Sequence, residues 1–267
     1  MRLRLGLALL TILALCGSAF VLYVRANSNP GCAVPRGSSE CTRVVFLGNS
    51  YTSVNDLPTM FTDLAWSGGH RVETAVRAPG GWTLRDHAHS PDTANLLTSS
   101  KWDFVVLQEQ SEIPSVESLR QATMYPAARD LVPTIRDAGA EPIFFVTWAH
   151  RNGWPVNGLP DYATMQSSID AAYLFIAGDQ HAPVAPVGYT WENVFKQESN
   201  LDLWQDDGSH PTTKGTYLAA CVFYASFFSE SPVGLKFHAG LADADVSQVQ
   251  AAAAATVLND LSRWGLR

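Results

Sequence analysis

Two short segments, far apart in the chain, carry residue types that together can perform acyl transfer. Residues 48–50 (Gly-Asn-Ser) place Ser50 after a short apolar run, and residues 207–211 (Asp-Gly-Ser-His-Pro) place Asp207 three positions before His210. A carboxylate can hold one ring nitrogen of a histidine while the other nitrogen takes a serine proton. Taken separately, the serine also fits a helix cap. Together, the two segments contain the residue types of a serine nucleophile with its base and acid.

Two further segments carry groups that can stabilise a negatively charged oxygen. The pair Gly80-Gly81 precedes Trp82, and paired glycines let the backbone approach a ligand and direct an N–H group at it. Residues 107–111 (Leu-Gln-Glu-Gln-Ser) follow another apolar run, and a side-chain amide there can donate to an oxyanion. Each segment alone also fits an ordinary turn or a polar loop.

The elements that must position these segments alternate between strands and helices from Thr42 onward. Short apolar runs predict strands at residues 43–47, 71–77, 104–107, 143–147 and 184–187. Helical spacing predicts helices at residues 57–68, 116–138, 161–177, 213–228 and 244–264. This pattern predicts a three-layer α/β fold of about five parallel strands with helices on both faces. Ligands bind such sheets beyond the carboxyl ends of the strands, where the four segments fall.

In this order, the four segments resemble the sequence blocks of the SGNH/GDSL hydrolases, a superfamily of serine esterases and acetylesterases. The resemblance covers residues 46–58, 78–84, 102–111 and 207–219, so it extends over nearly the whole region after Cys41. It implies a flavodoxin-like three-layer domain over residues 42–267 and an ester hydrolase that needs no cofactor.

Carried over residue by residue, the resemblance puts the nucleophile on Ser50, the base on His210 and the orienting acid on Asp207. Asp206 is adjacent, but the family spacing selects Asp207. The backbone N–H groups of Ser50 and Gly81 are then expected to bind the oxyanion.

The sequence departs from the common family pattern in two blocks. The first block reads Gly-Asn-Ser where Gly-Asp-Ser is usual, which leaves the nucleophile intact. The third block has no Gly-x-Asn, so the third oxyanion donor must be another amide. Gln108, closest to the end of the predicted strand, is the predicted donor, and Gln110 is the alternative.

Several aromatic residues fall on loops at the same edge of the predicted sheet: Tyr51, Trp82, Trp148, Trp154, Trp191 and Trp204. Indole faces can stack on sugar rings, although core packing is the alternative for each of them. We expect Tyr51, Trp82, Trp148 and His150 to bind substrate, and short acyl esters on carbohydrate to be that substrate. An O-acyltransferase and a non-catalytic glycan-binding module on the same fold are alternative functions.

Composition excludes some classes of partner and of site. The chain of 267 residues has a net charge of −7, which disfavours nucleic acid and anionic membrane surfaces as partners. A small-molecule or glycan ester is the expected partner. His87 and His89 have metal-ligand spacing, but no third ligand is evident nearby, so no metal site is predicted.

The N-terminal region has the features of an export segment. Arg2 and Arg4 precede an uncharged apolar run over residues 5–24, which fits a signal peptide ending near residue 26 or a membrane anchor. The protein is therefore expected to be secreted or periplasmic, touching a membrane only through this segment. Residues 27–41 read as a linker in which Cys32 and Cys41 are predicted to form a disulfide, two free thiols being the alternative.

Overall fold

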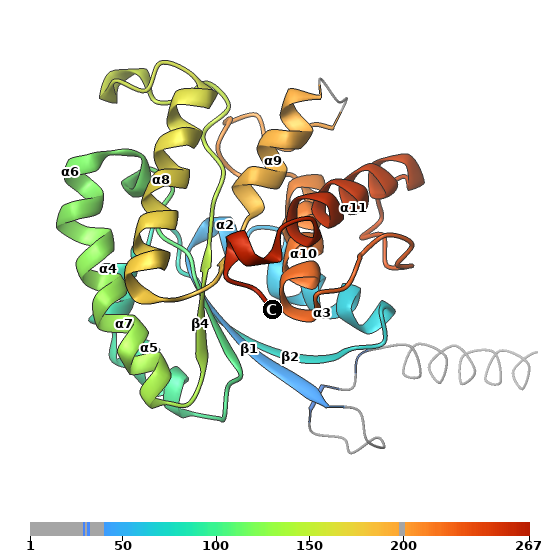
Figure 1. The fold of residues 1–267 in the computed structure, drawn as a ribbon, viewed down its shortest axis with the longest axis horizontal. Helices are drawn as coiled ribbons and strands as arrows, with labels where there is room; N and C mark the ends of the chain where they lie inside the picture. The colour runs from blue at the N-terminus through green and yellow to red at the C-terminus, as the bar shows by residue number, and fades with distance from the viewer. Residues whose placement is uncertain (1–28, 30, 33–39, 198–200) are drawn as a thin grey trace, which may run out of the picture.

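A single five-stranded parallel sheet forms the centre of the protein (Figure 1). The computed structural model describes residues 29, 31–32, 40–197 and 201–267. The strands lie in the order β2-β1-β3-β4-β5, and every neighbouring pair is parallel. Their bounds are β1 Cys41–Leu47, β2 Arg71–Arg77, β3 Phe104–Leu107, β4 Glu141–Phe145 and β5 Val184–Ala185. This is the strand order of flavodoxin-like folds, and it confirms the predicted α/β class.

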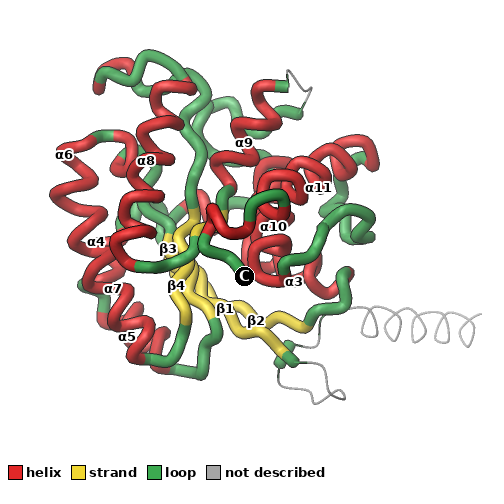
Figure 2. Tube along the Cα trace, viewed as in Figure 1, coloured by secondary structure: helices red, strands yellow, loops and turns green. Residues whose placement is uncertain are grey.

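Helices cover both faces of this sheet, as the ribbon and the tube show (Figures 1 and 2). One face carries α4 Leu84–Ala88, α5 Pro91–Thr98, α6 Glu117–Leu119, α7 Tyr125–Asp137 and α8 Tyr162–Gln180. The other face carries α3 Leu57–Ser67, α9 Val187–Lys196, α10 Thr213–Phe228 and α11 Asp243–Leu258. A short helix, α2 Ser50–Ser53, begins just beyond the end of β1.

The burial of β1 shows why its sequence forms a central strand. Val44, Val45, Phe46 and Leu47 have no exposed surface, because helices cover both faces of the sheet. A continuous apolar run, rather than an alternating one, is what such a position requires. The polar turn that follows therefore emerges at the carboxyl edge of the sheet.

An aromatic cluster joins the sheet to the helices that cover it. Phe223 of α10 contacts Phe46 of β1 and Phe145 of β4 with ring centroids 5.3 and 5.1 Å apart, and Phe61 of α3 at 6.2 Å. All four side chains have no exposed surface. This cluster fixes α10, and with it the loop that carries His210, against the sheet.

The structure differs from the sequence-based elements mainly at their ends. Strand β4 begins and ends two residues earlier than predicted, at Glu141–Phe145. The predicted helix over residues 116–138 contains a π-helical turn at Arg120–Met124 between α6 and α7. The last predicted helix ends at Leu258, and a separate 3-10 turn follows at Leu261–Trp264. Helices α4, α5 and α9 were not predicted, because each is short or directly follows a strand.

The described part of the N-terminal region is attached to the sheet. Cys32 and Cys41 form the predicted disulfide, and Cys41 is the first residue of β1. Asn29 Nδ2 donates to the carbonyl of Val72, and the Cys32 N–H donates to Glu73, both in β2. These described residues of the predicted linker are therefore held against the edge strand.

The predicted export segment over residues 1–26 lies outside the described residues. Among the helices that the structure does describe, none combines the length and the apolar character needed to cross a membrane.

Replacement of Phe223 tests the aromatic cluster. We expect Phe223→Ala to lower the free energy of unfolding by about 3–5 kcal/mol, because the cavity removes contacts with both layers. Phe175→Ala is the matched control, since this phenylalanine is 52% exposed, and we expect a change of about 1 kcal/mol or less. Urea unfolding of the two variants measures both values. Equal losses in the two variants would contradict the assignment of Phe223 to the core.

Candidate active site

Ser50 begins helix α2 at the carboxyl end of β1. The side chain of Asn49 caps this helix by accepting from the Tyr51 N–H at 3.1 Å. The Ser50 Oγ lies 2.9 Å from Nε2 of His210, 160 residues later in the chain. The hydroxyl is thus half-buried at a helix N-terminus with a base within hydrogen-bond reach.

Asp207 holds the His210 ring through Nδ1, on the side away from Ser50. The distance from His210 Nδ1 to Asp207 Oδ2 is 2.6 Å, and the other carboxylate oxygen accepts the N–H groups of Ser209 and His210 at 2.9 Å each. Burial raises the pKa of Asp207, but these hydrogen bonds outweigh it and lower the pKa to about 2. Asp207 is therefore ionised at neutral pH and holds the ring with Nε2 directed at Ser50.

The loop that carries His210 is fixed by two aromatic residues at Ser209. The Tyr51 hydroxyl lies 2.8 Å from Ser209 Oγ, and Trp148 Nε1 donates to the Ser209 carbonyl at 2.9 Å. Tyr51 stacks on Trp148, which stacks on Trp191, with ring centroids 4.4 and 4.1 Å apart. Tyr51 is 2% exposed and Trp148 is 1% exposed. The prediction that these two side chains bind substrate is wrong, because they lie inside the protein and support the loop.

The same burial removes most of the predicted aromatic groove. Trp191 and Trp204 are also buried, and Trp204 Nε1 donates to the Ala149 carbonyl at 3.0 Å. Trp82 and Trp154 are only half-buried. Trp82 lies in the turn directly after Gly81, and the Arg77 guanidinium lies 5.0 Å from the centre of its ring. Core packing thus explains four of the six aromatic residues, and Trp82 stays a candidate for substrate contact.

His150, which the sequence predicts to bind substrate, lies near the Asp207–His210 pair. Burial lowers its pKa, although the charges of Glu112 and Asp207 act in the opposite direction. Its Nε2 is buried and has no hydrogen-bond partner among the described residues. The buried Nε2 is out of reach of a substrate in this arrangement, so only the exposed part of the half-buried ring is available for a substrate contact.

Gln108, the predicted third oxyanion donor, cannot take that role. Its Nε2 donates to Asn49 Oδ1 at 2.9 Å and to the Glu109 carbonyl at 2.6 Å, which uses both of its hydrogens. Its Oε1 accepts from the Asn49 N–H and from Thr52 Oγ1, both at 2.9 Å. The side chain has no exposed surface. Gln108 is therefore a structural residue that joins the end of β3 to the turn before Ser50.

Gln110, the alternative, has an amide hydrogen without a partner among the described residues. Its Oε1 accepts from the N–H groups of Glu112 and Ile113 at 2.9 and 3.2 Å, which fixes the orientation of the amide. Its Nε2 has a single partner among the described residues, Ser111 Oγ at 3.4 Å. Gln110, and not Gln108, is therefore the candidate amide donor.

The backbone donors predicted by the resemblance are unoccupied. Neither the Ser50 N–H nor the Gly81 N–H has a hydrogen-bond partner among the described residues. Gly81 has φ +76°, a left-handed conformation that glycine adopts without strain, and it is exposed.

Asparagine at position 49 is explained by a bond that aspartate could not make. Its Nδ2 donates to the Trp82 carbonyl at 2.8 Å, while its Oδ1 accepts from Tyr51 and Gln108. A carboxylate has no donor for that carbonyl. Asn49 thus connects the turn that carries Ser50 with the turn that carries Gly81.

His87 stabilises the turn before Ser50, a role that the sequence did not predict. It is 1% exposed, and its Nε2 and Nδ1 lie 2.8 Å from the Gly48 carbonyl and 3.2 Å from Thr93 Oγ1. Burial lowers its pKa, so the ring is neutral at pH 7. Both ring nitrogens are used within the protein. In the described part of the chain, no group of three or more His, Cys, Asp or Glu residues is arranged to hold a metal.

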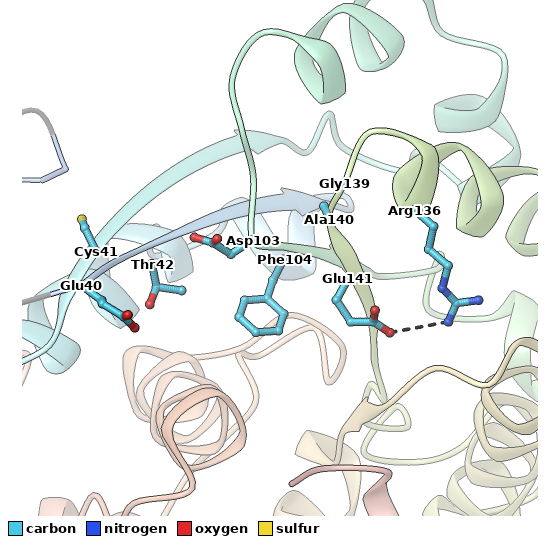
Figure 3. Close-up of a pocket in the computed structure, with 9 residues that line it drawn as sticks. All are labelled: Glu40, Cys41, Thr42, Asp103, Phe104, Arg136, Gly139, Ala140 and Glu141. Atoms are coloured by element: carbon cyan, nitrogen blue, oxygen red, sulfur yellow. Dashed lines mark ion pairs between the residues drawn. The ribbon is translucent and has the colours of Figure 1, made fainter.

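A separate cleft of about 840 Å³ lies at the amino ends of the strands, opposite the carboxyl ends near Ser50 (Figure 3). It is lined by the first residues of β1, β3 and β4, whereas Ser50 follows the end of β1. Two of its three carboxylates serve the fold, because Asp103 accepts the Arg43 N–H and Glu141 pairs with Arg136 at 3.5 Å. This cleft is therefore not part of the candidate active site.

A three-layer parallel sheet with serine, histidine and aspartate in contact beyond its carboxyl edge is the arrangement of a serine hydrolase. Comparison with known structures supports this classification. An SGNH hydrolase structure from Slackia heliotrinireducens is 30% identical, with a TM-score of 0.58 over 69% of this chain and 98% of that chain. The chain therefore belongs to the SGNH/GDSL hydrolase superfamily, and it is a carboxylic ester hydrolase.

Two further structures share the fold. A DUF4886 family protein from Bacteroides uniformis is 20% identical, with a TM-score of 0.69 over 82% of this chain and 95% of that chain. An acetyl-xylooligosaccharide esterase from Geobacillus is 13% identical, with a TM-score of 0.51 over 73% of this chain and 94% of that chain. No protein-family model and no curated protein sequence matches the chain.

Parallel alanine substitutions separate the roles of the two glutamines. We expect Gln110→Ala to lower kcat about 10²-fold with little change in thermal stability, because an oxyanion donor acts in the transition state. We expect Gln108→Ala to lower stability by about 1–3 kcal/mol for each buried group left without a partner. Ester hydrolysis assays and urea unfolding of both variants measure these effects. A stable Gln108→Ala protein beside a fully active Gln110→Ala protein would contradict both assignments.

Proposed function

We propose that this protein hydrolyses short acyl esters, acetyl esters in particular, carried by carbohydrate, and that Ser50, His210 and Asp207 are its catalytic triad. The observation that carries the proposal is the hydrogen-bonded series from Ser50 Oγ through the two ring nitrogens of His210 to Asp207, at 2.9 and 2.6 Å.

In the acylation step, Ser50 Oγ attacks the ester carbonyl while His210 Nε2 removes the hydroxyl proton. Asp207, ionised at neutral pH, stabilises the imidazolium that forms. The imidazolium then gives its proton to the departing sugar oxygen, which leaves as an alcohol. Water repeats the sequence on the acyl-enzyme, so His210 ends in its starting form and the acid is released.

Charge on the former carbonyl oxygen is stabilised by donors fixed before the substrate arrives. The candidates are the N–H groups of Ser50 and Gly81 and the amide of Gln110, each with an unused hydrogen in the described part of the chain. Fixed donors need no reorganisation as charge develops, which makes them effective.

Support for a carbohydrate acyl ester comes from the edge of the site. Trp82 is half-buried in the turn that presents the Gly81 N–H, and an indole face can stack on a sugar ring. The acetyl-xylooligosaccharide esterase from Geobacillus shares the fold.

Substitution of the triad tests the mechanism. We expect Ser50→Ala, His210→Ala and Asp207→Asn each to lower kcat on p-nitrophenyl acetate by about 10³-fold or more, because the three residues act as one unit. Wild-type protein should be labelled by a fluorophosphonate and Ser50→Ala should not.

Ser53→Ala is the matched control for the nucleophile, since Ser53 is an exposed serine of the same helix. It should keep wild-type activity and labelling. Full activity in Ser50→Ala would show that the nucleophile is another residue. Transfer of the acyl group to an added sugar in preference to water would identify an acyltransferase.

Replacement of Trp82 tests the substrate class. If its ring stacks on a sugar, Trp82→Ala should raise KM for acetylated xylo-oligosaccharides about two- to tenfold, with p-nitrophenyl acetate hydrolysis unchanged. Trp82→Phe should restore most of the affinity because it keeps an aromatic face. An equal KM for the sugar ester in all three proteins would remove Trp82 from the binding site.

A further inference from the structure

Glu109 is a buried acid between the loops that hold two of the candidate oxyanion donors, Gly81 and Gln110. It lies two residues beyond the end of β3 and has no exposed surface. Its Oε1 accepts the Gln110 N–H at 2.6 Å and the Leu84 N–H at 3.1 Å. Leu84 is the first residue of α4 and follows Gly81 by three positions. One carboxyl oxygen therefore joins the loop of Gln110 to the helix that ends the Gly81 turn.

The burial of the second carboxyl oxygen disfavours the charged form of Glu109. Oε2 is buried and has no hydrogen-bond partner among the described residues. The titratable groups that face Glu109 are Asp86 of α4 and Tyr173 of α8, whose hydroxyl accepts the Glu109 N–H at 3.0 Å. Burial raises the pKa of Glu109 to about 8, with the two N–H bonds acting against it and the charge of Asp86 adding to it. The side chain is thus a neutral acid at pH 7.

We propose that Glu109 is a positioning residue of the oxyanion hole, whose buried carboxyl group fixes the Gly81 turn and Gln110 relative to each other. The inference rests on the proposed function and extends it to the pH range of the enzyme. Glu109 touches no reacting atom, since its Oε1 accepts from the backbone of Leu84 and Gln110 and its Oε2 is buried.

The protonation state of Glu109 matters because an ionised carboxylate would lie beside the oxyanion hole. Loss of the proton places a full negative charge, away from solvent, next to the loops that must stabilise an oxyanion. Like charges repel strongly where water does not screen them. The rate should therefore fall as Glu109 ionises, while the geometry of the two loops changes little.

The experiment compares kcat and KM from pH 6 to pH 10 for the full chain and two variants. Wild-type kcat should decline above about pH 8 as Glu109 ionises. Glu109→Gln keeps an acceptor for both N–H groups and cannot ionise, so it should stay within about threefold of wild type at pH 7 and lose the alkaline decline. Glu109→Ala should lower kcat about 10- to 100-fold with a smaller change in KM, because the donors lose their positions.

Thermal unfolding across pH tests the neutral buried acid separately. Native Glu109 holds a proton between pH 4.5 and about 8 that the unfolded chain has released, so this group lowers stability as pH rises through that range. Glu109→Gln lacks this dependence, and its Tm relative to wild type should therefore increase with pH. Asp170→Asn is the matched control, because burial raises the pKa of Asp170 to about 7 in helix α8, where its carboxylate accepts from Gln166 of the same helix. It should show a similar trend in Tm and keep the wild-type alkaline decline in kcat.

Two results would overturn the role of Glu109 alone. One is an unchanged alkaline decline in Glu109→Gln, and the other is wild-type kcat in Glu109→Ala, each beside an inactive Ser50→Ala. A wild-type chain that hydrolyses no ester and takes no fluorophosphonate label would instead overturn the proposed function, and this inference with it.

Discussion

Three hydrogen bonds between the buried amide of Gln108 and residues Asn49 and Thr52 hold the end of β3 to the turn that carries Ser50, and a fourth goes to the adjacent Glu109 carbonyl. Parallel strands bring these two chain segments to one edge, but the sheet alone does not fix how their loops meet. The amide lies so close that any side chain at position 48 would collide with it, which explains the glycine there. Because unpaired buried polar groups are costly, this arrangement of the two loops is strongly favoured over alternatives.

The other parts of the site are held in the same manner, by polar groups that the protein satisfies internally. Ser209 is fixed by Tyr51 and Trp148, so the histidine loop is attached to the aromatic interior. Asn49 extends the network to the Trp82 carbonyl. Around the triad, the Ser50 and Gly81 N–H groups and one hydrogen of the Gln110 amide have no partner among the described residues, and an oxyanion needs donors of this kind. Preorganisation of this kind lets the donors act without rearranging as charge develops.

The sequence predicts the fold and the three residues brought together at its edge, because strand periodicity and the order of short motifs are local properties. It does not predict which side chains after a strand point inward. Gln108 and Gln110 differ by two positions and have the same chemistry, yet only burial and hydrogen bonding decide that the first is structural. The same difficulty applies to Tyr51 and Trp148, since the sequence does not show whether an aromatic residue on a loop faces solvent or fills the interior. The π-helical turn before α7 has no local signal of this kind.

The place where the chain enters the sheet has a consequence for access. Asn29 and Cys32 lie against the first residues of β2, and Cys41 starts β1. The chain therefore enters the sheet at the amino ends of the strands, and Ser50 lies beyond the carboxyl end of β1. If the residues before Asn29 held the protein to a surface, the catalytic edge would face away from that surface. An enzyme oriented in this way could act on polymers too large to pass between itself and its support.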